Sequence, residues 1–217
     1  MKQKTHHSLI LAVCLSLISG TIYAQMNTAV KPFLGLRGGV NFSNLYTDEV
    51  KDNNILTSFN AGVFANFPLT KMLSIQPEFG FSRKGSEQTY DNLLASGTAK
   101  FKLNYVEVPL LLKVNLAKSF NVHAGPYVAY LIDAGVTNET SSGNFNFEDN
   151  ISNEDLNKFD YGLSAGFGFD FTAIGIGARY NYGMRTVGKE RSFAGATYTI
   201  PEGKNSNVSI YVAIKLN

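Results

Sequence analysis

The chain has 217 residues, enough for one sizeable domain, and its 19 basic and 17 acidic residues give a formal net charge of +2. Two of the basic residues, Lys2 and Lys4, lie at the start, and without them the two signs are equal in number. Nucleic-acid-binding proteins usually carry a strong basic excess, so we expect no nucleic acid as a partner. The single cysteine, Cys14, also lies near the start, so the rest of the chain has no thiol for a disulfide or a metal.

The first 24 residues have the pattern of a secretory signal peptide. A basic start precedes the apolar run "LILAVCLSLISG" (9–20), and "IYA" (22–24) then ends in a small residue. This predicts cleavage after Ala24 and a domain over residues 25–217. A lipoprotein signal ending at Cys14 is the alternative, but the preceding residue is Val13 and the apolar run continues past the cysteine.

The rest of the chain alternates apolar with small or polar residues, as half-buried strands do. In "FDYGLSAGFGFDF" (159–171), for example, every odd position is apolar and every even position is Asp, Gly or Ser. Phe64 breaks the pattern, and a change of parity before Tyr105 predicts a bulge there. The lengths suit tilted membrane strands better than globular ones. The predicted strands are 33–44, 57–68, 73–84, 101–115, 120–133, 159–171, 174–184 and 207–216.

The connections alternate between two kinds. Residues 69–72, 116–119 and 172–173 are predicted tight turns, and the other connections are predicted long polar loops. Short turns at one end and long loops at the other are typical of bacterial outer-membrane barrels. We therefore predict an all-β fold, a closed eight-stranded antiparallel up-and-down transmembrane β-barrel with both termini at the periplasmic end. The predicted loops are 45–56, 85–100, 134–158 and 185–206.

The charged residues indicate which face of the barrel is outside. An eight-stranded barrel has room inside only for side chains or one small ligand, so it cannot hold every apolar side chain of eight long strands. We therefore expect the apolar face to contact lipid and the charges to pair within the lumen, because unpaired buried charges are costly. A secreted soluble sandwich is the alternative. Counting residues up from the short turns places the predicted lumen charge network at different heights: Arg37, Glu78 and Arg179 at similar heights, Glu107 somewhat above them, and Lys113, Asp170 and Lys215 lower.

The aromatic residues of the predicted strands gather at two levels, as the interfacial girdles of a membrane barrel do. One group lies near the long-loop ends: Phe42, Phe59, Phe81, Tyr130, Phe159, Tyr161 and Tyr182. The other lies near the short turns: Phe33, Phe67, Phe120, Phe169 and Phe171.

Several segments together resemble the PorT-like "porin family" of small outer-membrane β-barrels from Bacteroidetes. The most specific are "NYVEVPLLLKV" (104–114) and "AGPYVAYLI" (124–132), and "LGLRGGVNFSN" (34–44), "IQPEFGFSRKG" (75–85), 159–171 and "ARYNYG" (178–183) occur in matching order. The resemblance implies an integral protein of a Gram-negative outer membrane, inserted by the barrel-assembly machinery. It supplies no agreed activity, although some PorT-like members are associated with protein secretion.

Candidate chemistry is sparse in the predicted mature chain. His123 is its one histidine, and a hydrolase role for it is less expected than a packed polar role in the lumen. Glu148, Asp149, Glu154 and Asp155 suggest a solvated acidic loop more than a divalent-cation site, since EF-hand spacing is absent. Arg185, Lys189 and Arg191 are candidates for contact with lipopolysaccharide phosphates. We predict no catalytic, cofactor or metal site.

The sequence therefore predicts a non-enzymatic outer-membrane barrel with a plugged lumen, acting as a structural or interaction protein through its long outer loops. Its expected partners are membrane lipid, lipopolysaccharide and an envelope protein. Two alternatives remain open: a small-solute porin-like channel and a PorT-like role in protein secretion.

Overall fold

The computed structural model describes residues 31–46, 53–92, 95–140, 147–150, 156–188, 190–193, 196–199 and 203–216. The predicted signal peptide, residues 1–24, lies outside these ranges, so cleavage after Ala24 stays a prediction. No helix among the described residues is long and apolar enough to cross a membrane.

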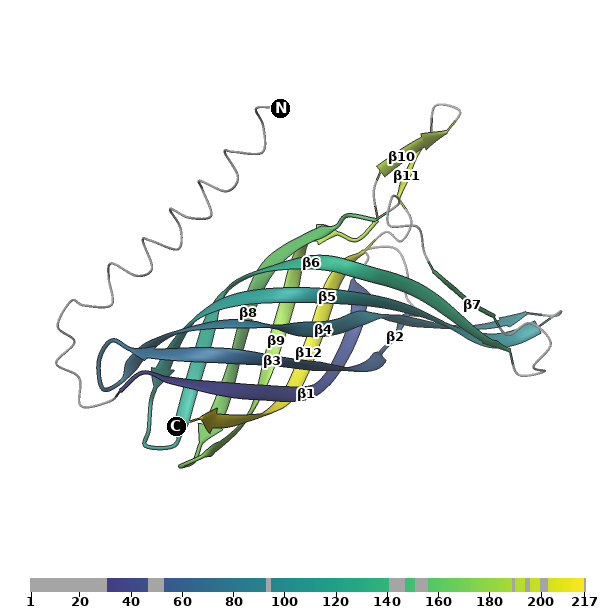
Figure 1. Ribbon diagram of the computed structural model, residues 1–217. Coiled ribbons are helices and arrows are strands. Elements are labelled where there is room, and N and C mark those ends of the chain that lie inside the picture. Colours follow the sequence, from purple (N-terminus) through teal and green to yellow (C-terminus); the bar gives the residue numbers. More distant parts are fainter. Residues whose placement is uncertain are drawn as a thin grey trace, which may run out of the picture.

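Eight antiparallel strands form a closed ring (Figure 1). Each pairs with the next along the chain, and the last pairs with the first, from Leu34↔Leu216 to Tyr46↔Lys204. Because the ring is closed, no strand edge around it is left unpaired. A lipid environment requires this, since it offers no hydrogen-bond partners to backbone groups. The fold class predicted from the sequence is therefore confirmed. The ring strands are β1 (Phe33–Tyr46), β3 (Leu56–Pro68), β4 (Leu73–Asn92), β5 (Ala95–Asn115), β6 (Phe120–Thr140), β8 (Phe159–Asp170), β9 (Ile174–Thr186) and β12 (Lys204–Leu216).

The three predicted tight turns are present, and they lie together at one end of the barrel, which we call the turn end. Backbone hydrogen bonds close them: Leu69 N–H donates to Leu73 O at 2.8 Å, and Leu116 N–H donates to Phe120 O at 3.0 Å. Phe171 N–H similarly donates to Ile174 O at 2.8 Å. The start of β1 and the end of β12 lie at the same end (Figure 1).

The two faces of the ring are inverted relative to a soluble protein. Apolar side chains on the outer wall are exposed, with Leu34 at 61% and Phe159 at 59%, whereas polar side chains in the lumen are buried. Asn41 and Arg179, for example, are 0% and 2% exposed. A continuous exposed apolar wall around a polar interior is the pattern of a membrane barrel. The prediction that the apolar face of the strands lies on the outside of the barrel is confirmed.

One member of the predicted aromatic girdles lies elsewhere. Phe33 shares the inward parity of Gly35 and Arg37, and it lines the mouth of the lumen at the turn end. Its ring contacts Phe64 at a centroid distance of 6.1 Å. Phe33 is therefore a lumen residue and was wrongly placed in the lipid-facing girdle. The other eleven positions have the outward parity that the girdles need.

Phe64, the predicted exception to the alternation, points into the lumen and is buried. Space for its ring comes from Gly35 on the neighbouring strand, where an added Cβ would lie 2.2 Å from Phe64 Cζ. The aromatic side chain thus fills the volume that a small residue leaves, so the strand keeps its regular path.

The predicted bulge near Tyr105 lies on the neighbouring strand. The β5–β6 register shifts between Asn104↔Asp133 and Tyr105↔Leu131, so Ile132 is the extra residue. Ile132 and Asp133 are both exposed, and burial changes parity there. Leu103 and Tyr105 both point inward and are buried, so β5 itself keeps its parity.

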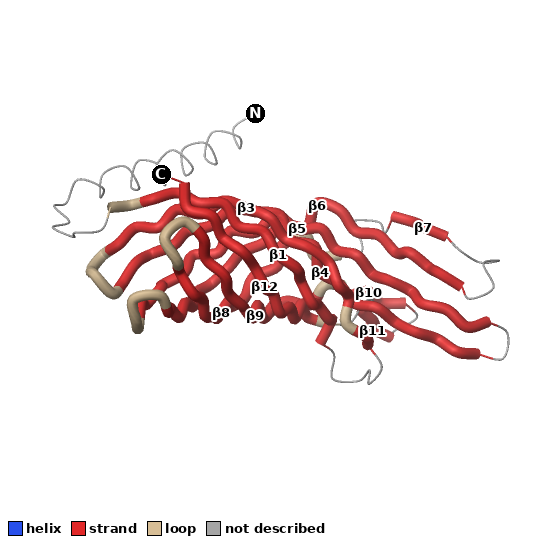
Figure 2. Tube along the Cα trace, turned by 90° about the horizontal axis from the view of Figure 1, so that it is seen from below, coloured by secondary structure: helices blue, strands red, loops and turns tan. Residues whose placement is uncertain are grey.

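Three strands continue well past the others and form what we call the sheet extension, residues 86–92, 95–101 and 134–140 of β4, β5 and β6 (Figure 2). The β4–β5 pairing runs without a break to Asn92↔Ala95. The prediction that 85–100 is a long loop is therefore wrong, as is the start of the predicted loop 134–158. These segments are polar and lack the apolar alternation, so they resembled loops in the sequence. Their backbones nevertheless pair as strands.

The remaining predicted loops contain short strands. β2 (Asn53–Asn54) pairs with β4, and β7 (Phe147–Asn150) pairs with β6 along the sheet extension. β10 (Glu190–Phe193) and β11 (Ala196–Thr199) form a separate hairpin, which projects from the ring in Figure 1. Glu154, Asp155 and Lys189 of the predicted loop sites lie outside the described residues.

Candidate functional site in the barrel lumen

The lumen holds charged side chains at three levels. The middle level, which we call the central cluster, consists of Arg37 on β1, Glu78 on β4 and Arg179 on β9. Arg179 donates twice to Glu78, with Nη1–Oε2 and Nη2–Oε1 distances of 2.8 and 2.9 Å. Arg37 Nη1 donates to the same Oε2 at 2.6 Å. One carboxylate thus bridges two guanidinium groups across the width of the barrel.

Aromatic and amide side chains enclose the central cluster. The Tyr211 ring lies under both guanidinium groups, at 4.8 Å from Arg37 Cζ and 5.4 Å from Arg179 Cζ. Cation–π contacts of this kind partly replace the water that the buried cations lose. Gln76 Nε2 donates to Glu78 Oε1 at 2.8 Å, and Asn60 Oδ1 accepts from Arg37 at 3.2 Å.

His123 belongs to the packing around this cluster. Arg179 Nε donates to His123 Nε2 at 3.3 Å, so the ring proton lies on Nδ1, which is 3.1 Å from Asn121 Oδ1. The imidazole is buried, and its ring lies 6.2 Å from the Tyr211 ring. Both ring nitrogens are therefore engaged by neighbouring lumen side chains.

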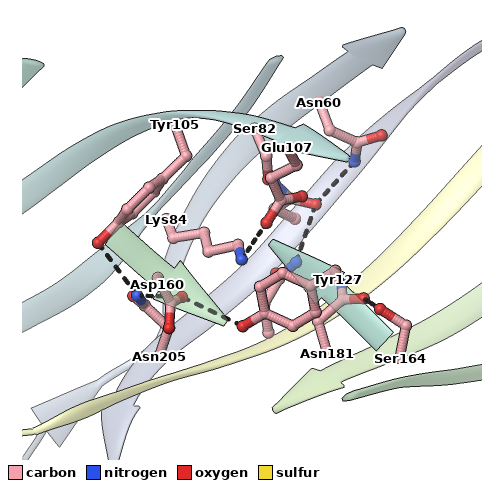
Figure 3. Close-up of polar contacts among 12 residues, drawn as sticks. Asn60, Ser82, Lys84, Tyr105, Glu107, Tyr127, Asp160, Ser164, Asn181 and Asn205 are labelled. Atoms are coloured by element: carbon pink, nitrogen blue, oxygen red, sulfur yellow. Dashed lines mark hydrogen bonds and ion pairs between the residues drawn. The ribbon is translucent and has the colours of Figure 1, made fainter. Parts of the chain in front are cut away.

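The upper cluster lies toward the sheet extension and consists of Lys84, Tyr105, Glu107, Tyr127, Asp160 and Asn205 (Figure 3). Lys84 forms an ion pair with Glu107, and its Nζ lies 4.5 Å from the centre of the Tyr127 ring. Asp160 Oδ2 accepts hydrogen bonds from Tyr127 Oη at 3.1 Å and from Asn205 Nδ2 at 3.0 Å. Lys84 therefore lies among aromatic rings with a carboxylate as its partner.

The lower cluster lies near the turn end and consists of Lys113, Asp170 and Lys215. Lys113 Nζ is 2.6 Å from Asp170 Oδ2, and Lys215 Nζ is 3.9 Å from Asp170 Oδ1. Lys215 also donates to the carbonyl of Phe171 at 3.0 Å. One carboxylate here lies between two ammonium groups.

Little open volume remains around the central cluster. A cavity of about 30 Å³ lies beside Arg37, Glu78 and Arg179 on the upper side, and another of about 20 Å³ lies below them. Either is close to the volume that a single water molecule needs. We infer that side chains close the lumen at this level.

The structure brings the seven predicted lumen charges together in three groups at different heights. Arg37, Glu78 and Arg179 share the central level; Glu107 lies above them, and Lys113, Asp170 and Lys215 lie below. Lys84 was not predicted, because the predicted strand ended there and its partner was not assigned. Asp160 and Tyr211 also lie in the lumen, and their contacts were not predicted. The register of neighbouring strands is the information from which the contacts of these residues could have been predicted.

Ligand chemistry beyond these ion pairs is not apparent in the described ranges. Among those residues, no group of three or more His, Cys, Asp and Glu side chains is placed to hold a metal ion. Glu148 and Asp149 lie on β7, paired through the backbone with Thr137 and Val136. Arg185 donates to Asn157 Oδ1 at 2.9 Å and to the carbonyl of Phe159 at 3.3 Å.

Comparison with known proteins gives similar barrels at low sequence identity. Ail of Yersinia pestis is 10% identical with a TM-score of 0.46, and Neisserial surface protein A is 11% identical with a TM-score of 0.49. Both similarities cover 86% of this chain and 100% of the other. OprG of Pseudomonas aeruginosa is 14% identical with a TM-score of 0.40, over 85% of this chain and 95% of the other. No curated protein sequence matches the chain.

The family described as "Outer membrane protein beta-barrel domain" matches residues 23–187, which is most of the chain. This match agrees with the closed eight-stranded ring and with its apolar outer wall. The chain belongs to the outer membrane protein beta-barrel domain family.

Proposed function

We propose that the protein is a non-enzymatic barrel of the Gram-negative outer membrane that holds a partner at the cell surface on its sheet extension. The observation that carries this proposal is the length of three strands. β4, β5 and β6 have 20, 21 and 21 residues, whereas the other five ring strands have 12–14. The shorter strands already suffice to span a bilayer, so the extra length serves a purpose outside it.

The lumen favours an interaction role over the two other functional classes. The central cluster and its small cavities argue against passage of solutes, which disfavours the porin-like alternative. His123, the candidate base, is buried and engaged at both ring nitrogens by Asn121 and Arg179. A general base needs access to the proton that it removes, so this environment supports a packing role.

Lipopolysaccharide is the first partner that the outer wall suggests. At the base of the sheet extension, Arg83 Nε donates to Asn104 Oδ1 at 2.8 Å, and its guanidinium lies 5.3 Å from the Phe59 ring. Asn104 in turn donates to Asp133 at 2.8 Å. Arg83 is thus held beside the upper aromatic girdle with its terminal nitrogens directed to no other described residue, and guanidinium groups bind phosphate through paired donors.

The narrower assignments from the sequence belong to the same proposal. We infer export through a cleaved signal peptide, insertion by the barrel-assembly machinery, and a partner that is lipopolysaccharide, another envelope protein or an external ligand. A PorT-like role in protein secretion and an origin in Bacteroidetes rest on the sequence resemblance alone.

Photo-crosslinking in whole cells tests the proposal. A photoreactive residue at position 100, on β5 in the sheet extension, should give a crosslinked species. The same photoreactive group at position 100, in a variant with Asn-Gly in place of residues 88–99, should give none. A variant lacking the β10–β11 hairpin, with the group at position 100, is the matched control and should crosslink normally. Crosslinking that persists in the 88–99 variant would refute the proposal.

The lipopolysaccharide contact has its own test. Arg83→Gln should reduce the lipopolysaccharide that stays bound through detergent purification, whereas Lys31→Gln, at the opposite end, should leave it unchanged. Equal retention by both variants and the native protein would contradict a role for Arg83.

A further inference from the structure

The lumen opens at the turn end into a basin of about 440 Å³. Its floor is the lower cluster, and its rim is formed by the β3–β4 and β5–β6 turns. A water molecule in the liquid takes about 30 Å³, so the basin has room for a group the size of phosphoglycerol. This contrasts with the small cavities around the central cluster above it.

Positive charge dominates the basin. Lys113 and Lys215 lie at its floor with Asp170 between them, and Lys71 and Lys118 lie on the two turns of the rim. Four ammonium groups therefore face one carboxylate. Among the described residues, neither Lys71 nor Lys118 forms an ion pair, so the rim charges are available to a ligand. A basin with one dominant sign of charge attracts anions.

The rim also carries apolar side chains that place it at the membrane surface. Leu69, Met72 and Leu116 on the turns are exposed. Apolar side chains next to lysines are typical of the boundary between acyl chains and head groups, where the long lysine side chain reaches toward phosphate. In the orientation of an outer-membrane barrel, with short turns on the periplasmic side, this boundary is that of the inner leaflet.

We propose that the basin is a binding site for a phosphate group, presented by an anionic phospholipid head group of the inner leaflet or by a soluble phosphorylated compound of the periplasm. Lys71 and Lys118 bind the phosphate oxygens from the rim, and Lys215 supplies the charge that Asp170 leaves uncompensated. This site lies at the opposite end from the sheet extension, so it does not depend on the proposed function.

Methionine methyl groups give a direct readout of binding. Met72 lines the basin, and Met184 lies exposed on the outer wall toward the other end, so it serves as an internal control. Protein labelled with ¹³C-methyl methionine in an uncharged detergent is titrated with dihexanoyl phosphatidylglycerol, glycerol 3-phosphate and dihexanoyl phosphatidylcholine. We expect the methyl resonance of Met72 to shift saturably with phosphatidylglycerol, or with both anionic probes. The resonance of Met184 should not shift. The zwitterionic phosphatidylcholine should give a weaker shift of Met72.

Two double variants remove the same amount of charge from opposite ends. The rim variant K71Q/K118Q should weaken binding of the anionic probes about fivefold, since exposed ion pairs are individually weak. K100Q/K102Q, on β5 at the base of the sheet extension, should leave it unchanged. Binding of glycerol 3-phosphate as tight as that of phosphatidylglycerol would identify a soluble ligand; binding of phosphatidylglycerol alone would identify a lipid head group. No saturable shift, equal binding of phosphatidylcholine, or equal weakening by both variants would overturn the proposal.

Discussion

At the level of single residues, Glu78 carries one negative charge between the guanidinium groups of Arg37 and Arg179. All three side chains are largely removed from solvent, so bulk water cannot take the place of the carboxylate. Removing one partner of a buried ion pair is costly because the other charge is left without compensation. The central cluster therefore depends on Glu78 more than on either arginine.

Glu78→Gln should lower the free energy of unfolding by about 3–5 kcal/mol, because it leaves two buried guanidinium groups without a counter-charge. Urea unfolding in detergent micelles, followed by the heat-dependent shift in gel mobility, measures this change. Asp133→Asn is the control, because it removes a carboxylate that is exposed on the outer wall and should cost about 1 kcal/mol or less. A Glu78→Gln variant as stable as the native protein would contradict the claim that Glu78 stabilises the fold by compensating the two buried guanidinium groups.

Gly85 gives a second test at the residue level. Its φ of +147° is rarely adopted by other residues, and an added Cβ would lie 1.8 Å from the carbonyl oxygen of Phe101. Gly85→Ala should destabilise the protein by about 1–3 kcal/mol. Gly38→Ala is the matched control, since its Cβ would contact only Asn60 O at 3.7 Å. The same unfolding assay should show little effect there, and an equal effect of both changes would argue against strain at Gly85.

The faces of these residues and their heights in the barrel were predictable from the sequence, but their individual contacts were not. The period of two fixes that Glu78 and Arg179 share the lumen, because each lies at a polar position between apolar ones. Counting residues up from the tight turns also places Arg37, Glu78 and Arg179 at similar heights, but it does not identify the partner of Lys84. Lys84 pairs with Glu107 although the β4–β5 register places Lys84 opposite Leu103, four residues before Glu107 on β5, so this contact could not be found by matching opposite positions.

At the level of elements, the sheet extension shows where alternation stops being informative. Within the membrane, each strand needs an apolar face toward lipid, and the sequence shows it. Beyond the membrane that requirement ends, while backbone pairing continues from Gly85↔Lys102 to Asn92↔Ala95. Segments 86–92 and 95–101 therefore have the composition of loops although they are strands. The tight turns were easier to predict, because an apolar strand lies directly on either side.

Replacing residues 88–99 by Asn-Gly should leave the barrel intact. The upper cluster begins at Lys84 and Tyr105, and the shortened hairpin keeps the pairs from Glu87↔Lys100 downward. We expect the same heat-dependent gel shift and the same β-type circular dichroism as for the full chain. Loss of the gel shift would mean that the sheet extension is needed for the ring to close.

At the level of the whole molecule, the ring provides a membrane anchor and ion pairs fill the lumen. The apolar wall contacts lipid, and three levels of paired charge span the barrel from the turn end to the sheet extension. The surfaces left for chemistry are the sheet extension on one side of the membrane and the basin on the other. We therefore propose that the molecule presents two exposed ends and that no passage for solutes connects them.

Electrical recording across a planar lipid bilayer tests this central claim most directly. The purified native monomer is inserted, and insertion is verified by the heat-dependent gel shift of protein recovered from the same lipid. The side chains of the central cluster close the lumen and leave only small cavities beside them. We therefore predict no steady conductance above the baseline of the bare bilayer. Large, steady single-channel steps from the monomer would contradict it, since ions would then cross at the level of Arg37, Glu78 and Arg179.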